Sequence, residues 1–338
     1  MKLKGTDDPE LTATVEGLVN GDTISYTLSR EPGESVGKYP ITPEGEATQG
    51  NYTVVFVPGT LTIVKPKQKM GDFSLVWFSD LLLTGEGAHD DAFLAMVQKV
   101  HGIGALATLH TGNMVDAFDN ENAWASAKET LKSIKTAFYG IAGAKDVNGD
   151  ETNYDAYLAA NLNSKTHENA DGSVWYKTLK SQPVLIIGIG YNKIAETDEE
   201  KELEEQRFAF AQKAIAQNPD KYTVLLVNDY IDANGELTAF GKLVEEKLVK
   251  DNENVSLILC GGADGAAHVE MTYGERKVNA VMYNYTADEE NGLGFMRVLT
   301  FNGKEKTITF TTINALNDKT AYDETKPELD NFTIDEAF

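Results

Sequence analysis

The sequence has very little cysteine and no long apolar segment. Cys260 is the single cysteine among 338 residues, so an intrachain disulfide is impossible. The longest apolar run, residues 183–190, is far too short to cross a bilayer as a helix. The first five residues also lack the pattern of a secretory signal peptide. These absences exclude a disulfide-stapled fold and direct insertion into a membrane.

Basic residues are scarce as well. Lysine and arginine number 30 against 53 aspartates and glutamates, which gives a formal net charge of -23. Such a surface repels nucleic acid and anionic membranes, and it repels polyanionic substrates unless a cation occupies the site. Hydrophobic residues make up 41% and charged residues 25%, a composition typical of globular proteins, and the length favours two domains.

The first part of the chain has the alternating pattern of β-strands. Apolar and polar residues alternate over residues 11–16 and 52–56, and again over residues 61–63. Turn-forming residues separate these stretches, and no helical periodicity is present. The pattern predicts a small all-β module over residues 1–67, with a structural or binding role rather than a catalytic one.

Three stretches of this segment have the sequence pattern of one protein family. They are residues 17–22 (GLVNGD), 36–41 (VGKYPI) and 50–63 (GNYTVVFVPGTLTI). The segment resembles the MBG-type repeat of large bacterial surface proteins. The resemblance implies a spacer or adhesive module, an extracellular or cell-surface location, and a chain that is part of a longer exported precursor.

After a charged linker at residues 65–69, strand and helix patterns alternate. The pattern predicts strands at residues 74–78, 104–109, 184–188, 222–227, 255–260, 278–285, 294–301 and 306–312. It predicts helices at residues 91–100, 123–138, 197–217 and 240–250. The order indicates a layered α/β domain over residues 70–338.

Four of the predicted strands are followed by polar residues. These residues are Asp80, Asn113, Asn228 and Asp264. Each one alone is a common turn or cap residue, but ligand sites of α/β sheets lie beyond the carboxyl ends of strands. Four such residues in succession predict one shared site.

The order of these strand-end motifs is similar to that of the calcineurin-like metallophosphoesterases. The motifs are Ser79-Asp80, Thr111-Gly112-Asn113 with Asp116, Gly143-Ala144-Lys145-Asp146, residues 225–230 (LLVNDY), and Cys260-Gly261-Gly262-Ala263-Asp264. The resemblance covers residue 72 to the C-terminus. It implies two packed mixed sheets flanked by helices.

The same resemblance implies a two-metal site, and this sequence departs from it at nearly every ligand. Of the positions that hold the metals in that family, only position 80 carries the family's residue, an aspartate. The other ligand positions carry Leu82, Asn113, Ala144, Asn228, Gly262 and Asp264. An amide at the position of the bridging carboxylate supplies no charge between two cations, and no imidazole remains at a matched position.

Lys145 stands at the position of the histidine that protonates the leaving group. We expect no metal, and we expect Lys145 to pair with Asp80 or another acid. Asp146, with Asn148 and Asp150, has the spacing of a calcium loop. Glu151 and Tyr157 replace its glycine and bidentate glutamate, so a solvated acidic turn is predicted there. His110 and His268 lie beside motif residues, and His110 is expected to be a hydrogen-bonded structural histidine.

Three functions follow from these patterns. The first is a catalytically degenerate phosphoesterase domain that serves as a binding or structural module, with an unidentified ligand such as a cell-surface glycan or protein. The second is an active phosphoesterase with a remodelled site. It would use one Ca²⁺ or Mg²⁺ held by the oxygens of Asp80, Asn113, Asn228 and Asp264, or a divalent metal pair. The third is a cell-surface adhesin segment in which the β module binds.

Overall fold

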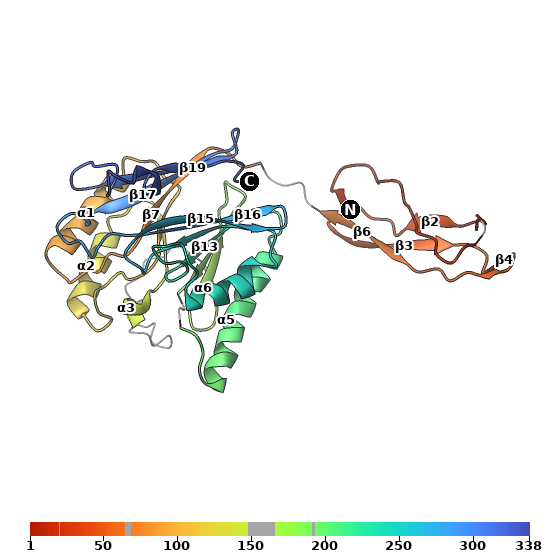
Figure 1. Ribbon diagram of the computed structural model, residues 1–338, viewed down its shortest axis with the longest axis horizontal. Coiled ribbons are helices and arrows are strands. Elements are labelled where there is room, and N and C mark those ends of the chain that lie inside the picture. Colours follow the sequence, from red (N-terminus) through yellow and green to blue (C-terminus); the bar gives the residue numbers. More distant parts are fainter. Residues whose placement is uncertain (20, 65–68, 148–165, 191–192) are drawn as a thin grey trace. The chain divides into compact units, whose positions relative to one another are not determined.

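The computed structural model describes residues 1–19, 21–64, 69–147, 166–190 and 193–338. The chain divides into two compact units, Met1–Lys67 and Gln68–Phe338 (Figure 1). Each unit has its own sheets. In the described residues, no helix is long and apolar enough to cross a membrane.

The N-terminal unit is built on a four-stranded sheet with the order β1-β6-β3-β2. Its strands are β1 (Lys2–Leu3), β2 (Thr27–Arg30), β3 (Gly37–Glu44) and β6 (Gly59–Val64), and a short ribbon joins β4 (Thr48–Gln49) to β5 (Tyr52–Thr53). β1 runs parallel to β6, whereas the other pairs are antiparallel. Among its described residues, only Lys2, Leu61 and Ile63 are buried.

Of the strands predicted in this unit, one does not form and another is shorter than predicted. Residues 11–16 form no strand, and the strand predicted at residues 52–56 ends at Thr53. The β3–β6 ladder stops at the pair Ile41–Gly59, next to Pro58, which has no N–H to continue it. Alternation alone therefore misled the prediction, because no buried surface receives the apolar side chains of these segments.

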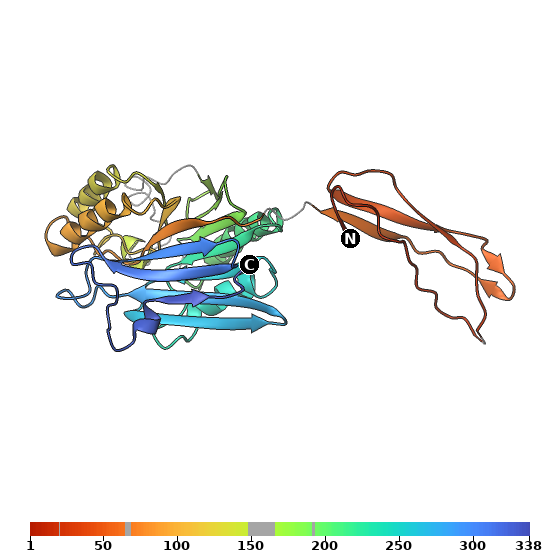
Figure 2. The same ribbon diagram turned by 90° about the horizontal axis from the view of Figure 1, so that it is seen from above.

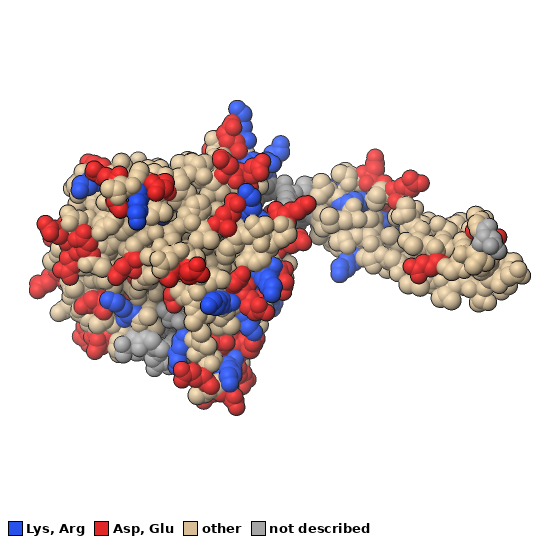
Figure 3. All heavy atoms as spheres, in the orientation of Figure 1, with Lys and Arg blue, Asp and Glu red and all other residues tan. Residues whose placement is uncertain are grey.

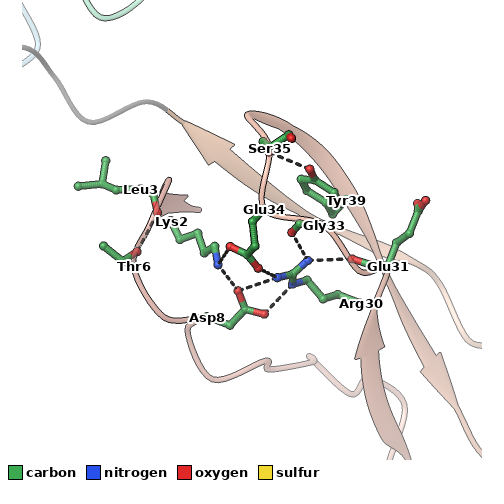
Figure 4. A network of polar contacts seen from close by, with 10 residues as sticks. All are labelled: Lys2, Leu3, Thr6, Asp8, Arg30, Glu31, Gly33, Glu34, Ser35 and Tyr39. Atoms are coloured by element: carbon green, nitrogen blue, oxygen red, sulfur yellow. Dashed lines mark hydrogen bonds and ion pairs between the residues drawn. The ribbon is translucent and has the colours of Figure 1, made fainter.

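A cluster of four charged side chains ties the start of this unit to β2 and the following loop (Figure 4). Lys2 Nζ lies 2.6 Å from both Asp8 Oδ1 and Glu34 Oε2, and Arg30 Nε lies 2.6 Å from Asp8 Oδ2. The guanidinium of Arg30 also lies over the ring of Tyr39, 5.4 Å from its centroid. Hydrogen bonds from Arg30 and Lys2 lower the pKa of Asp8 to about 2. The ionic cluster thus holds a unit that has almost no apolar core.

The α/β unit contains two mixed sheets. The six-stranded sheet has the order β19-β18-β17-β7-β8-β9, and its strands are β7 (Phe73–Phe78), β8 (Ala107–His110), β9 (Ala137–Gly140), β17 (Phe295–Asn302), β18 (Thr307–Asn314) and β19 (Phe332–Ile334). The seven-stranded sheet has the order β10-β11-β12-β13-β14-β16-β15, and its strands are β10 (His167–Glu168), β11 (Val174–Thr178), β12 (Val184–Ile189), β13 (Tyr222–Val227), β14 (Val255–Cys260), β15 (Gly265–Tyr273) and β16 (Arg276–Asn284).

Three apolar clusters make this unit a four-layered sandwich. One cluster fills the space between the sheets and includes Trp77, Leu109 and Leu259. A second lies under α5 (Asp198–Ala216), α6 (Ala239–Val244) and the π-helix Glu245–Val249. The third lies under α1 (Ala88–Val100) and α2 (Glu121–Leu131), which Figure 2 shows in orange and yellow to one side of the blue strands. The predicted fold class, an α/β sandwich preceded by an all-β module, is confirmed.

Some predicted element boundaries agree with the structure, and others do not. β13 and β14 occupy the predicted residues, and α5 begins after a capping box in which Thr197 and Glu200 satisfy each other's backbone N–H groups. The helix predicted at residues 123–138 is too long, because α2 ends at Leu131 and residues 137–140 pair with β8 as β9. The short helix α3 (Ala144–Val147) follows β9.

Candidate functional site

The loops that follow β7, β8, β9 and β14 pack against one another with almost no space between them. A Cβ atom added at Gly143 would lie 2.3 Å from Asn113 Oδ1, and one added at Gly261 would lie 2.3 Å from Asp80 Oδ2. Both contacts are too short for any other residue. These glycines allow the strand ends of the two sheets to meet, so the loops after β7, β8, β9 and β14 lie together at this edge.

Asp80 is the charged residue at the centre of these loops, and it is 6% exposed. Its Oδ1 accepts a hydrogen bond from Asn113 Nδ2 at 2.6 Å. Its Oδ2 accepts from Ser79 Oγ at 2.8 Å and from the Gly262 N–H at 3.0 Å. Burial raises the pKa of Asp80, and these donors oppose the rise. Neutral donors thus occupy both carboxylate oxygens.

Asn113 holds the neighbouring loops in position through its backbone and its side chain. Its carbonyl oxygen accepts from the N–H groups of Leu81 at 2.9 Å and Leu82 at 3.0 Å, and its Oδ1 accepts from the Lys145 N–H at 2.9 Å. Asn113 and Leu82 both have left-handed backbones, with φ of 56° and 51°. Asparagine tolerates this conformation, but a branched apolar residue such as Leu82 is strained by it.

Asn228 and Asp264 differ in how they lie relative to this centre. Asn228 is buried; its Nδ2 donates to the Thr111 carbonyl at 2.8 Å, and its own carbonyl accepts from the Gly261 N–H at 3.1 Å. Asp264 is exposed, and its Oδ1 is 3.4 Å from Asn284 Nδ2. Within the described residues, no hydrogen bond joins Asp264 to Asp80 or Asn113. Asn228 links the two sheets, whereas Asp264 stays at the rim.

Asp146 anchors the loops rather than facing an open space. It is 1% exposed and accepts from the N–H groups of Val115 at 3.0 Å and Gly143 at 2.8 Å. Burial raises its pKa to about 7, although these backbone donors oppose the rise. The other positions of the calcium-like spacing, residues 148, 150, 151 and 157, lie outside the described residues.

The predicted pairing of Lys145 with Asp80 is wrong. The Lys145 side chain is exposed, and the described residues include no ion pair to it. Burying an ammonium group costs more solvation than burying the amide of Asn113, which donates to Asp80 instead. The positive charge therefore remains in solvent, outside the closed centre.

His110 is structural, but the expectation that it would be hydrogen-bonded is wrong. It is fully buried, and neither ring nitrogen has a hydrogen-bond partner among the described residues. Desolvation lowers its pKa to about 3, because the charged imidazolium would lose its hydration. The ring stacks at 6.1 Å on Phe138, so it packs as a neutral aromatic group. His268 instead contacts Asn279 Oδ1 at 2.8 Å.

A small cavity of about 20 Å³ adjoins Asp80, and its lining includes His89, Tyr283 and Tyr285. This volume is room for about one water molecule and not for a phosphate ester. His89 Nδ1 contacts the Leu81 carbonyl at 2.9 Å. The sequence patterns did not single out His89, because its position on α1 brings it to the site only through the fold.

The sequence patterns also did not single out a buried cation, Arg297, which packs against a tyrosine of the cavity lining. Arg297 of β17 is 0% exposed, lies 4.6 Å from the centroid of the Tyr283 ring, and donates to the Leu329 carbonyl at 2.7 Å. It is 3.6 Å from the buried Asp330, which accepts from the Tyr285 hydroxyl at 2.7 Å. No local pattern marks this pair, since 33 positions separate its members (330 minus 297).

Comparison with known proteins supports both units. Residues 1–62 match the family described as MBG domain (YGX type). An uncharacterized protein of Bacillus subtilis (strain 168), YvnB, is 24% identical over 247 residues, which is 67% of this chain and 18% of that protein. The chain therefore spans about a fifth of the length of this curated relative.

One solved structure with a TM-score above 0.5 supports the fold of the second unit. Purple acid phosphatase PPD1 from yellow lupin (Lupinus luteus) seeds superposes with a TM-score of 0.55 at 10% identity, over 88% of this chain and 59% of that chain. The structure of PhoD gives a TM-score of 0.48 at 10% identity, over 85% of this chain and 74% of that chain. These likenesses concern the fold alone.

Both resemblances read from the sequence are thus confirmed. The chain combines a small all-β module with an α/β sandwich of the metallophosphoesterase type. Its first 62 residues are an MBG domain of the YGX type.

The residues at the strand ends do not fit the metal pair that this kind of fold implies. Neutral donors occupy both oxygens of Asp80, and Leu82, Ala144 and Gly262 carry no side-chain donor atom. Among the residues that the structure describes, no three His, Cys, Asp or Glu side chains are grouped to hold a metal ion. No catalytic step through a metal can be derived from these contacts.

Proposed function

We propose that the α/β unit is a catalytically degenerate metallophosphoesterase-like domain of an exported bacterial protein, in which it serves as a binding or structural module. The observation that carries the proposal is the 2.6 Å hydrogen bond from Asn113 Nδ2 to Asp80 Oδ1. Two carboxylates at these positions would repel each other without a cation between them. An amide and a carboxylate attract each other, so this pair is stable without any metal.

The electrostatics around Asp80 also disfavour phosphate chemistry. A phosphate ester brings further negative charge to a buried acid in a chain of net charge -23. Arg297 and Lys145 do not compensate this charge, because Arg297 is buried beside Asp330 and Lys145 is exposed. The proposal therefore assigns the closed strand ends a role in stabilising the fold.

The MBG domain supports the location and partner that we propose. Such a domain is of a surface-repeat type, so we propose that the protein is exported and acts at the cell surface. The partner would be a surface glycan or a protein, since the acidic chain repels nucleic acid. Specific binding of the whole chain to cell-wall glycans would favour the adhesin function. No binding would leave the MBG domain as a spacer.

Elemental analysis of chain purified without chelator, paired with hydrolysis of bis-p-nitrophenyl phosphate, tests the proposal. We expect no bound transition metal above background and no hydrolysis beyond the buffer rate. Two transition metals per chain, with hydrolysis abolished by Asp80→Ala but kept by the control Asp251→Ala, an exposed acid outside the strand-end motifs, would overturn it. One Ca²⁺ or Mg²⁺ per chain, lost in Asp80→Ala, would show a remodelled oxygen-donor site instead.

A further inference from the structure

The MBG domain exposes large apolar side chains, whereas most side chains of this kind in the α/β unit are buried. Of the twelve described large hydrophobic residues that are exposed, eight belong to the first 67 residues: Met1, Leu3, Val15, Val19, Tyr26, Val36, Val55 and Val57. Val55 and Val57 are 80% and 76% exposed. Burial alternates here, with Val54 and Phe56 half-buried and Val55 and Val57 exposed, so the two exposed valines point to the same side of the segment.

This segment has backbone groups that are free to pair. Residues 54–58 form no regular strand and lead directly into β6, and the Val54 N–H donates to the Ala47 carbonyl at 2.9 Å. Within the described part of the chain, the N–H groups of residues 55–57 form no hydrogen bond. On the outer side of β6, β1 pairs only with Ile63 and Val64. Within the described residues, a backbone edge without a partner on its outer side therefore runs from residue 55 into β6 as far as residue 61.

The open edge also lacks the charges that normally protect such an edge. Residues 47–64 contain no charged side chain, in a chain of which 25% is charged. Exposed edge strands are usually blocked by lysine, by other charges or by proline, and here only Pro58 is present. On the face in view, Figure 3 shows the end of this unit that carries β4 and β5 as mostly uncharged.

We propose that this edge, residues 55–61, pairs antiparallel with the same edge of a second copy of the chain. Pairing between two copies of this edge is consistent with where the charges of the chain lie. The edge is neutral and does not repel itself, whereas the rest of a surface of net charge -23 keeps two copies apart. A two-fold contact uses one surface twice, and a neutral, valine-rich strand is complementary to itself. The added strand pairs the free N–H groups and covers Val55 and Val57.

Sedimentation velocity of the full chain over a range of concentrations tests the proposal. We expect a monomer–dimer equilibrium that shifts towards dimer as salt rises, because salt screens the repulsion between the acidic surfaces. The double variant Val55→Lys, Val57→Lys puts like charges on the edge and is expected to weaken the dimer at least about tenfold. The matched control Val19→Lys, Val36→Lys adds the same charges to exposed valines elsewhere in the domain and is expected to keep the dimer.

A spectroscopic label fixes where the two copies meet. A nitroxide on Val55→Cys is expected to give a short intermolecular distance by double electron–electron resonance, and one on Val36→Cys a longer distance. Cys260 is buried and does not compete for the label. A chain that stays monomeric at every salt concentration would overturn the proposal. Equal weakening by both lysine pairs, or a short distance only at position 36, would overturn it too. Circular dichroism confirms that each variant is folded.

Discussion

The two units of this chain are stabilised by different interactions. The α/β unit has three clusters of buried apolar side chains, whereas the MBG domain buries three described residues, and one of those is Lys2. The α/β unit contains the fully buried ion pair Arg297–Asp330, and the MBG domain uses the ionic cluster of Lys2, Asp8, Arg30 and Glu34. Loss of a charge should therefore have different consequences in the two units.

The largest effect is expected from Asp330→Ala in the α/β unit. The substitution leaves the fully buried guanidinium of Arg297 without its counter-charge and leaves the Tyr285 hydroxyl without its acceptor. Breaking a buried pair in this way costs about 3–5 kcal/mol of unfolding free energy. Urea denaturation followed by tryptophan fluorescence measures the loss, and exposed Asp264→Ala is the control. A loss equal to that of the control would show that the buried pair contributes nothing.

A smaller loss is expected when Asn113→Asp restores a carboxylate beside Asp80. The variant removes an amide donor 2.6 Å from Asp80 and places two acids in contact, at a cost of about 2–3 kcal/mol near neutral pH. The loss should shrink at acidic pH, because one of the two carboxyls then keeps its proton. Thermal unfolding at two pH values measures it. Unchanged stability at neutral pH would mean that a bound cation compensates the second carboxylate.

Asp146 and His110 should make opposite contributions to the pH dependence of stability. The pKa of Asp146 is raised to about 7, so its contribution is present below pH 4 and is lost as pH rises through 7. The pKa of His110 is lowered to about 3, so its contribution is present above pH 6.5 and is lost as pH falls through 3. Between about pH 4 and 6.5 the two slopes cancel.

Single variants separate these two slopes. In Asp146→Asn, stability should rise with pH between 4 and 6.5, and in His110→Phe it should fall, by up to about 1.4 kcal/mol per pH unit in each case. Urea midpoints across this range measure both. Parallel pH profiles in the two variants would contradict the assignment of the opposing slopes to these two residues.

The smallest effect is expected in the MBG domain from the ionic cluster. The pKa of Asp8 is lowered to about 2, so the stability that it contributes is present above pH 4 and is lost as pH falls through 2. Hydrogen exchange of the amides in β1 and β6 should accelerate relative to β13 when the pH drops through this range. Asp8→Asn should remove that difference, and a pH dependence retained in Asp8→Asn would assign it to other groups.

Much of the α/β fold could be predicted because its signals are local. β13 and β14 are continuous apolar runs that end at Asn228 and Gly261, and α5 starts at its own capping box. β9 was missed because residues 137–140 extend a helical pattern, and only the pairing with β8 determines that they form a strand. In the MBG domain, alternation predicted strands for which the structure provides no apolar surface.

The candidate site was predictable as a set of strand ends but not as a set of contacts. The sequence order predicted that Asp80, Asn113 and Asn228 lie together. Asp80 and Asn113 follow the paired strands β7 and β8, and Asn228 follows β13 of the other sheet, from which its side chain donates to Thr111. The direction of the Lys145 side chain and the exposure of Asp264 depend on solvation and packing, which no spacing encodes. Arg297 and Asp330 meet only through the folded sheet, since β17 and the C-terminal segment are far apart in the sequence.

The parallel pairing of β1 with β6 has a mechanical consequence. In a chain held at both ends, tension pulls β1 towards its N-terminal end and β6 towards its C-terminal end. Because Lys2 lies beside Ile63 and Leu3 beside Val64 in parallel strands, these opposite pulls slide the strands past each other instead of peeling them apart. The backbone hydrogen bonds and the contacts of Lys2 with Asp8 and Glu34 must then rupture together rather than one after another. The MBG domain thus resists stretching along the chain better than its small core alone would allow.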